Sequence, residues 1–143
     1  MQQPNDKAAL AGLIDGKVIW DVNADDPVRL ARQFKIMART YDDLKNQDVI
    51  PLMVFAFRGA STTFVSNNLD AFGDEQRAAV EDIQATIKAL AAKEGVTMEV
   101  CAIASNRMGV APDSLLPEMH LVGNSFCSLI GYQGDGYALI PIS

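Results

Sequence analysis

Val49-Ile-Pro-Leu-Met-Val-Phe-Ala-Phe57 is the segment from which the architecture of this chain can be worked out. Its apolar residues are too continuous, and too rich in types that favour β-structure, for a helix on the protein surface. Pro51 is compatible with a strand because it lies close to the start of the run. The segment therefore predicts a strand that is buried on both faces, as the strands of parallel sheets are.

The sequence before this strand predicts another strand and a long helix. Lys17-Val-Ile-Trp-Asp-Val22 is a short apolar run between polar and glycine-containing segments, which is typical of a buried strand. Asp25 or Asp26 can cap the helix that follows, and Pro27 suits its first turn because the missing N–H of proline is not needed there. Apolar residues then recur every three or four positions over about five turns. They are Leu30, Phe34, Met37, Tyr41 and Leu44.

Strand and helix patterns go on alternating after Phe57. A second long helix opens at Gly73-Asp74 and ends at Gly95, with an apolar face formed by Ala79, Ile83, Ile87 and Leu90. No structure is predicted for residues 64–72. The remaining predicted elements are a strand over Val96–Cys101, a short helical segment up to Gly109, a turn over residues 112–117, a strand over 120–122, a helix over 124–133 and a strand over 136–142.

Strands that alternate with helices indicate parallel β-α-β units, in which helices cover both faces of a sheet. The predicted elements therefore place the chain in the α/β class. A chain of 143 residues with 49% hydrophobic content has the size of one ordinary domain. We expect a single domain over residues 1–143, with residues 1–15 as a loosely ordered N-terminal extension.

Composition argues against two classes of partner. The formal net charge is −6 and no cluster of lysine or arginine is present, so nucleic acid is not an expected partner. No run approaches the roughly 18 to 20 apolar residues that cross a bilayer, so no membrane association is expected and the chain should be soluble. The first residues lack the pattern of a secretion signal. Two compartments stay open: the cytoplasm, or the periplasm if a signal peptide was removed.

Cys101 has the clearest chemical position, because it lies where the strand Val96–Cys101 gives way to the segment 102–109. Open parallel sheets bind ligands at this carboxyl end of their strands. The N–H groups of a following helical turn can stabilise a thiolate there, and a lowered pKa makes a cysteine nucleophilic near neutral pH. The alternative is that Cys101 packs as a small buried hydrophobe, as free cysteines commonly do.

Two other segments, residues 23–26 and 58–63, end at the same edge if the sheet is parallel. Arg58 can then favour the thiolate by its charge, and the hydroxyls of Ser61, Thr62 and Thr63 can donate hydrogen bonds to it. Each also has a structural explanation, because Arg58 can pair with a carboxylate and the hydroxyls can cap the next segment. The other candidate anion-binding residues of these loops are Asn23, Gly59, Ala102 and Asn106, whereas Arg107 is expected in solvent.

Other familiar sites are not found in the sequence, and neither a cofactor nor a metal is expected. The segment after Phe57 lacks the spacing and the lysine of a phosphate-binding loop. One histidine and two separated cysteines do not make a zinc site, and His120 has no partner motif. Cys127 falls among apolar residues of the last predicted helix and is expected to pack there. A disulfide between Cys101 and Cys127 stays geometrically open.

The motifs of the chain, taken in order, resemble those of the DsrE/DsrF-like family, which also contains YchN-like proteins and TusD-type sulfur carriers. The matching stretches are Lys17-Val-Ile-Trp-Asp-Val-Asn-Ala-Asp-Asp-Pro27, Phe57-Arg-Gly59, Gly95-Val-Thr-Met-Glu-Val-Cys-Ala102, Leu115-Leu-Pro117 and Gln133-Gly-Asp-Gly-Tyr-Ala138. The resemblance implies a three-layer α/β/α sandwich with a five-stranded, mainly parallel sheet, and a homo-oligomer, either trimer or hexamer. Many relatives carry His-Gly where this chain has Arg58-Gly59, so a fixed charge replaces an imidazole.

In the carriers of this family, a cysteine after the third strand takes up sulfane sulfur as a persulfide and passes it to another thiol. Cys101 stands at that position. The resemblance therefore implies a sulfur carrier or sulfurtransferase-like protein, with sulfur donor and acceptor proteins as partners. The alternative is an oligomeric module that binds a small anion or a protein tail without turnover. A nucleotide-binding domain is disfavoured because the chain has no glycine-rich phosphate loop.

Overall fold

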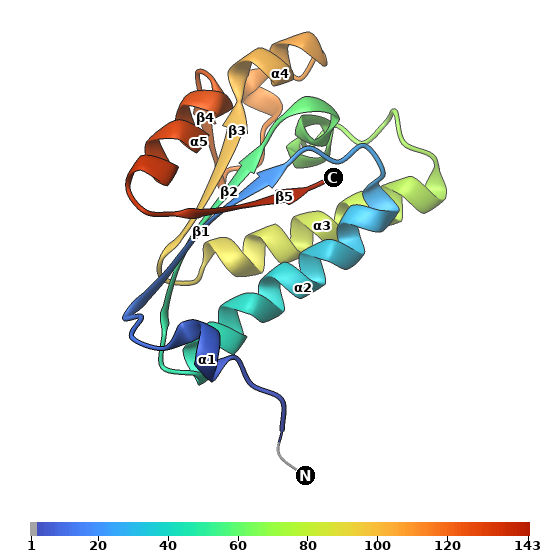
Figure 1. Cartoon of the computed structure of the whole chain (residues 1–143). Helices are drawn as coiled ribbons and strands as arrows, with labels where there is room; N and C mark the ends of the chain where they lie inside the picture. The colour runs from blue at the N-terminus through green and yellow to red at the C-terminus, as the bar shows by residue number, and fades with distance from the viewer. Residues whose placement is uncertain (1–2) are drawn as a thin grey trace.

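The computed structural model describes residues 3–143, which form a five-stranded sheet with the order β4-β3-β2-β1-β5 (Figure 1). All neighbouring strands are parallel. Helices α2 (Pro27–Asn46) and α3 (Asp74–Ala91) cover one face of the sheet, and α5 (Ser125–Gly134) covers the other. The predicted three-layer α/β/α architecture is therefore confirmed. The strands are β1 (Asp15–Val22), β2 (Ile50–Phe57), β3 (Val96–Cys101), β4 (Met119–Val122) and β5 (Ala138–Ile142).

β2 occupies the centre of the sheet, with β1 and β3 paired on either side. Its side chains alternate between the two faces, as in any strand. Phe55 and Phe57 belong to the main core beneath α2 and α3, whereas Val54 and Ala56 belong to a smaller core beneath α5. Both faces of β2 are thus buried, as its continuous apolar sequence predicts.

The helix α2 begins and packs as its sequence predicts. The Asp26 carboxylate caps the helix by accepting a hydrogen bond from the Val28 N–H at 3.0 Å. The ring of Phe34 stacks on two aromatic rings of β2, with centroid distances of 5.7 Å to Phe55 and 5.8 Å to Phe57. These contacts fasten α2 to the middle of the sheet.

The second long helix, α3, packs beside α2 with a slightly different face from the predicted one. Its buried residues are Val80, Ile83, Ile87 and Leu90, so Val80 takes the place predicted for Ala79. Between β2 and α3, residues Gly59–Val65 form a 3₁₀ helix, η1, that the sequence pattern did not predict. None of the helices within residues 3–143 combines the length and the apolar content needed to cross a membrane.

Cys127 is exposed on α5, so the prediction that it packs in the core is wrong. The residues that α5 turns toward the protein are Ser125, Leu129 and Tyr132, at spacings of four and three. A residue at position 127 lies about 200° around the helix from position 125 and therefore points outward. Ile130, on the same outer side, is 72% exposed.

Part of the expected N-terminal extension has regular structure. Lys7–Leu10 forms the short helix α1, and Asp15 already belongs to β1, two residues before the predicted strand start. The backbone N–H of Asp6 donates to the Gln47 side-chain oxygen at 2.7 Å, which ties this segment to the end of α2. Residues 1–2 of the predicted extension lie outside the described part of the chain.

Replacement of Phe34 should destabilise the fold strongly. Phe34 is 0% exposed and packs on two rings of the central strand, so Phe34→Ala should lower the free energy of unfolding by about 3–5 kcal/mol. Ile36 lies on the same helix and is 66% exposed, so Ile36→Ala should change it by less than about 0.5 kcal/mol. Chemical denaturation measures both values, and equal losses in the two variants would contradict the packing described here.

Candidate functional site

The carboxyl ends of the three central strands meet at one edge of the sheet. The Arg58 N–H, directly after β2, donates to the Val22 carbonyl at the end of β1 at 2.9 Å. Cys101 is the last residue of β3, next to β2. Arg58 and Cys101 both line a pocket of ≈ 310 Å³ at this edge. The topology thus brings together two residues that are far apart in the sequence.

Cys101 joins β3 to the short helix α4 (Ala102–Arg107) and lines the pocket with little of its own surface exposed. Its side chain is 4% accessible, and the Sγ accepts a hydrogen bond from the Ser125 N–H at 3.4 Å. Cys101 is therefore buried, as its packing alternative expects, yet it also lines a pocket, and a backbone N–H at the start of α5 bonds its sulfur.

The environment of Cys101 favours the thiolate. Burial raises the pKa of Cys101, but the nearby N–H groups of Ala104, Ser125 and Ile103 and the Ser125 hydroxyl favour the anion, outweigh burial and leave the pKa below its ordinary value; of these groups, the Ser125 N–H donates a hydrogen bond to the Sγ. A larger fraction of this thiol is then ionised near neutral pH than of an ordinary cysteine.

Arg58 is held by a carboxylate while it lines the same pocket. Its Nε lies 2.8 Å from Asp21 Oδ1 and its Nη2 lies 3.1 Å from Asp21 Oδ2, a two-point pairing that fixes the guanidinium plane. The hydrogen bond to Asp21 raises the pKa of Arg58 against the opposing effect of burial, and the charges of Asp21 and Cys101 raise it further. The guanidinium carbon also lies 5.3 Å from the centroid of the Phe126 ring. The pairing of Arg58 with a carboxylate is therefore confirmed, whereas its effect on the thiolate stays a prediction.

The hydroxyls of Ser61 and Thr62 do not serve the thiol, which corrects the expectation that they bind an anion. Both residues are 0% exposed, and neither lines the pocket. The Ser61 hydroxyl lies 2.7 Å from the Arg58 carbonyl and 2.9 Å from the Val22 carbonyl, and the Thr62 hydroxyl donates to the Gly59 carbonyl at 2.9 Å. Hydroxyls in this position satisfy backbone carbonyls three residues back, and here they close η1.

Gly59 lines the pocket and approaches Asn23 closely. Its φ is +59°, a left-handed conformation that glycine adopts without strain, and a Cβ at this position would collide with the Asn23 side-chain oxygen. Asn23 itself is exposed and does not line the pocket. Gly59 therefore lets β2 turn sharply into η1 beside the thiol.

The remaining predicted residues lie on α4 but outside the pocket wall. Ala102 is half-buried and Asn106 is exposed, and neither lines the pocket. Arg107, which was expected in solvent, is exposed and does line it. Sequence reasoning also missed Ser125, although the predicted helix start near Asn124 after the fourth strand was a signal, because that helix start falls at the same edge as Cys101.

A buried carboxylate lies on the same side of β3 as the thiol. Glu99, two residues before Cys101, is 7% exposed, and the Tyr132 hydroxyl donates to its Oε2 at 3.5 Å. Burial raises the pKa of Tyr132, and the charge of Glu99 raises it further. Tyr132 thus stays protonated over a wide pH range and helps cover this carboxylate beneath α5. Glu99 does not line the thiol pocket.

His120 does not line the Cys101 pocket. His120 is exposed on β4 and pairs in register with Glu99 of β3. Over residues 3–143, no group of three or more His, Cys, Asp or Glu side chains is placed to hold a metal ion.

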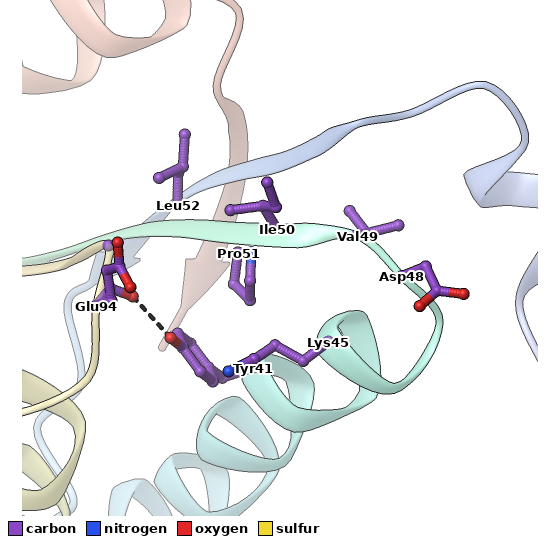
Figure 2. Close-up of a pocket in the computed structure, with 9 residues that line it drawn as sticks. Tyr41, Lys45, Asp48, Val49, Ile50, Pro51, Leu52 and Glu94 are labelled. Carbon is purple, nitrogen blue, oxygen red and sulfur yellow. Dashed lines mark hydrogen bonds between the residues drawn. The ribbon is translucent and has the colours of Figure 1, made fainter.

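A second pocket, of ≈ 410 Å³, lies at the opposite edge of the sheet, around the start of β2 (Figure 2). There the Tyr41 hydroxyl donates to the Glu94 backbone carbonyl at 2.7 Å, the bond drawn in Figure 2. The Lys93 ammonium lies 5.0 Å from the centroid of the Tyr41 ring. These contacts join α2 to the loop before β3, and no cysteine, serine or histidine lines this pocket.

The fold and the pocket define a class of protein: a parallel α/β domain with a thiol of lowered pKa at the carboxyl edge of its sheet. Residues 17–142 match the model of the DsrE/DsrF-like family, and the chain belongs to that family. The match begins in β1 and reaches the end of β5, so it covers the whole sheet except the first two residues of β1.

Individual relatives are similar to this chain in sequence or in fold. An uncharacterized protein of Aquifex aeolicus is 25% identical over 125 residues, which are 87% of this chain and 55% of that protein. The chain thus spans about half the length of this curated relative. The structure of MTH1491, a protein of unknown function from Methanobacterium thermoautotrophicum, matches with a TM-score of 0.68 and 16% identity over 90% of this chain and 100% of that one. The YchN protein of E. coli matches with a TM-score of 0.55 and 11% identity over 90% and 99%.

Alkylation should show that Cys101 ionises at a lower pH than an ordinary thiol. In a Cys127→Ser background, the rate of reaction with iodoacetamide should reach half its maximum at a pH below the usual cysteine range, because hydrogen bonds to the Sγ favour the thiolate. Ser125→Ala removes one of these donors and should move the midpoint to higher pH. Intact-mass analysis at graded pH measures the midpoint.

Ser128→Ala is the matched control, because Ser128 lies on the same helix and does not line the pocket. This variant should leave the alkylation midpoint unchanged. A midpoint at or above that of free cysteine in the parent protein would show that burial, and not hydrogen bonding, dominates at Cys101.

Proposed function

We propose that this protein is a sulfur carrier that holds sulfane sulfur as a persulfide on Cys101 and passes it to a partner thiol. The observation that carries the proposal is a thiol of lowered pKa on the floor of an open pocket. Membership of the DsrE/DsrF-like family supports it, because that family is associated with sulfur relay. We also propose that a sulfur donor loads Cys101 and that a sulfur acceptor unloads it.

The transfer needs no general base once the thiol is ionised. The Cys101 thiolate attacks the outer sulfur of a donor persulfide R–S–SH, and a bond forms between Sγ and that sulfur. The bond between the two donor sulfurs breaks, and R–S⁻ leaves with the electron pair. The product is Cys101–S–SH, with no net oxidation or reduction. An acceptor thiolate then attacks the outer sulfur of Cys101–S–SH and releases the Cys101 thiolate in the same way.

The charge of Arg58 suits a relay of anions. The two-point pairing with Asp21 fixes the guanidinium in the wall of the pocket that Cys101 also lines, where its charge favours the thiolate and the persulfide anion over their protonated forms. An imidazole at this position would supply and accept protons, whereas a guanidinium only stabilises negative charge. In this chain, proton transfer is therefore left to solvent and to the leaving thiolate.

The proposal includes a homo-oligomer, either a trimer or a hexamer. The exposed apolar side of α5 supports association of this kind. Phe126 is 56% exposed and Ile130 is 72% exposed on this helix, next to the pocket. Apolar side chains gathered on one exposed helix favour association with another surface. Light scattering coupled to size exclusion would measure the number of subunits, and a monomer at micromolar concentration would contradict this part of the proposal.

A binding module without turnover is the second candidate. It is favoured by the apolar walls of the pocket, where Ile103 is 53% exposed and Met108 is 43% exposed. A ligand that stabilises the protein equally in the parent and in Cys101→Ser, in a thermal-shift assay, would favour binding without thiol chemistry.

Incubation with glutathione persulfide should add one sulfur atom to the protein at Cys101. In a Cys127→Ser background, which removes the exposed thiol of α5, the addition should persist, and it should disappear when Cys101→Ser is added to that background. Intact-mass spectrometry detects the added sulfur, and a reducing agent should remove it. No addition in the Cys127→Ser background, or the same addition after Cys101→Ser in that background, would rule out the carrier function.

A further inference from the structure

The Cys101 pocket concentrates positive charge on an acidic protein. Two arginines, Arg58 and Arg107, line it, and none of its lining residues is Asp or Glu. The whole chain has a formal net charge of −6. A cavity lined by one sign of charge raises the local concentration of ligands of the opposite sign.

The two arginines differ in how much of their charge is free to act on a ligand. Arg58 is paired at two points with Asp21, so two of its N–H donors are taken and its charge is shared between Asp21 and the pocket. Arg107 is exposed in the last turn of α4 and forms no ion pair within residues 3–143. Arg107 is thus the uncompensated cation of the pocket, with guanidinium donors available to an anion.

Arg107 and Cys101 stand at opposite ends of α4. The six residue steps between them correspond to about 9 Å along a helix axis. Both residues line the same pocket, whose other lining residues include the apolar Ile103, Met108 and Phe126, so a ligand that fills it presents a charge to Arg107, a sulfur to Cys101 and an apolar stem to the walls. Thiosulfate, in which charge and sulfur are adjacent, does not have this shape, whereas a thiol peptide with a carboxylate does.

The size and the walls of the pocket suit a small molecule of this kind. The volume of ≈ 310 Å³ is at the lower end of the range for small-molecule sites. Ile103, Met108 and Phe126 provide an apolar surface for the stem of the ligand. Carboxylates are bound by a guanidinium through two parallel hydrogen bonds, which adds orientation to attraction.

We propose that Arg107 determines the donor specificity of the pocket: it binds the carboxylate of a low-molecular-weight, anionic persulfide whose outer sulfur meets the Cys101 Sγ. This inference rests on the proposed sulfur-carrier function and names the class of donor for that same site. Transfer follows the step given above, with the carboxylate-bearing thiolate as the leaving group. The donor is then a small thiol persulfide, in place of the donor protein expected from the family resemblance.

The test compares two donors with the same tripeptide skeleton, one with free carboxylates and one with both carboxylates esterified. Single-turnover loading of Cys101 is measured by intact mass, in a Cys127→Ser background, with glutathione persulfide and with the persulfide of glutathione diethyl ester. The first donor should load faster. Arg107→Gln should slow loading by glutathione persulfide about tenfold, the size of one charge-assisted hydrogen bond, and leave loading by the ester unchanged.

Two further variants separate a specific contact from a general effect of charge. Arg29→Gln removes the same charge from an exposed residue that does not line the pocket, and it should load both donors as the parent does. Arg107→Lys keeps the charge without the two-point geometry, and it should recover only part of the preference for glutathione persulfide. Unchanged thermal unfolding of each variant shows that the fold is intact.

The outcomes distinguish this inference from the proposed function. Failure of the parent protein to load from any donor overturns the proposed function and the inference with it. Loading of the parent at equal rates by the acid and the ester, or equal slowing of both by Arg107→Gln, overturns the inference alone. Faster loading by thiosulfate, lost in Arg107→Gln, also overturns it and assigns Arg107 to inorganic anions.

Discussion

Parallel pairing of all five strands is the constraint from which the site follows, because it sends every strand toward the same edge. Parallel strands require helical crossovers, and these cover both faces of β2, so its sequence is apolar on both sides. The same geometry places the ends of β1, β2 and β3 next to one another. Residues from three distant parts of the chain therefore meet at Cys101 without any long excursion of the backbone.

The site shows how a buried sulfur can still carry charge. Taking the thiolate away from water costs free energy, and the N–H groups of α4 and of the start of α5 offset that cost. Asp21 holds Arg58 by two hydrogen bonds, while Arg107, which lines the same pocket, forms no ion pair within residues 3–143. The pocket thus places a thiol of lowered pKa beside two arginines.

Local signals in the sequence predict much of the fold and the position of the thiol. The capping residue Asp26, the apolar stripe of α2 and the continuous run of β2 each depend on neighbours within a few positions, and each has the predicted structure. The place of Cys101 at the end of β3 also follows from local pattern. These features could be predicted because one physical preference dominates each of them.

The features that the sequence did not predict are those for which a side chain has more than one possible hydrogen-bond partner or packing surface. Ser61 and Thr62 can donate to a distant sulfur or to carbonyls three residues back, and the nearer partners win in η1. Cys127 lies in a helix with apolar residues on several sides. Which side of this helix packs against the sheet decides whether Cys127 is buried or exposed, and the local sequence does not determine that side. The bond from Ser125 to Cys101 joins residues on different elements, and only the folded topology brings them together.

The Asp21–Arg58 pair links β1 to the loop after β2, and it limits which substitutions the two positions tolerate. Asp21 is 8% exposed, so a neutral residue at position 58 would leave its carboxylate without a counter-ion in a poorly hydrated place. A neutral residue at position 21 would instead release the guanidinium into the thiol pocket. Positions 21 and 58 are therefore coupled, and the cost of replacing one residue depends on which residue stands at the other.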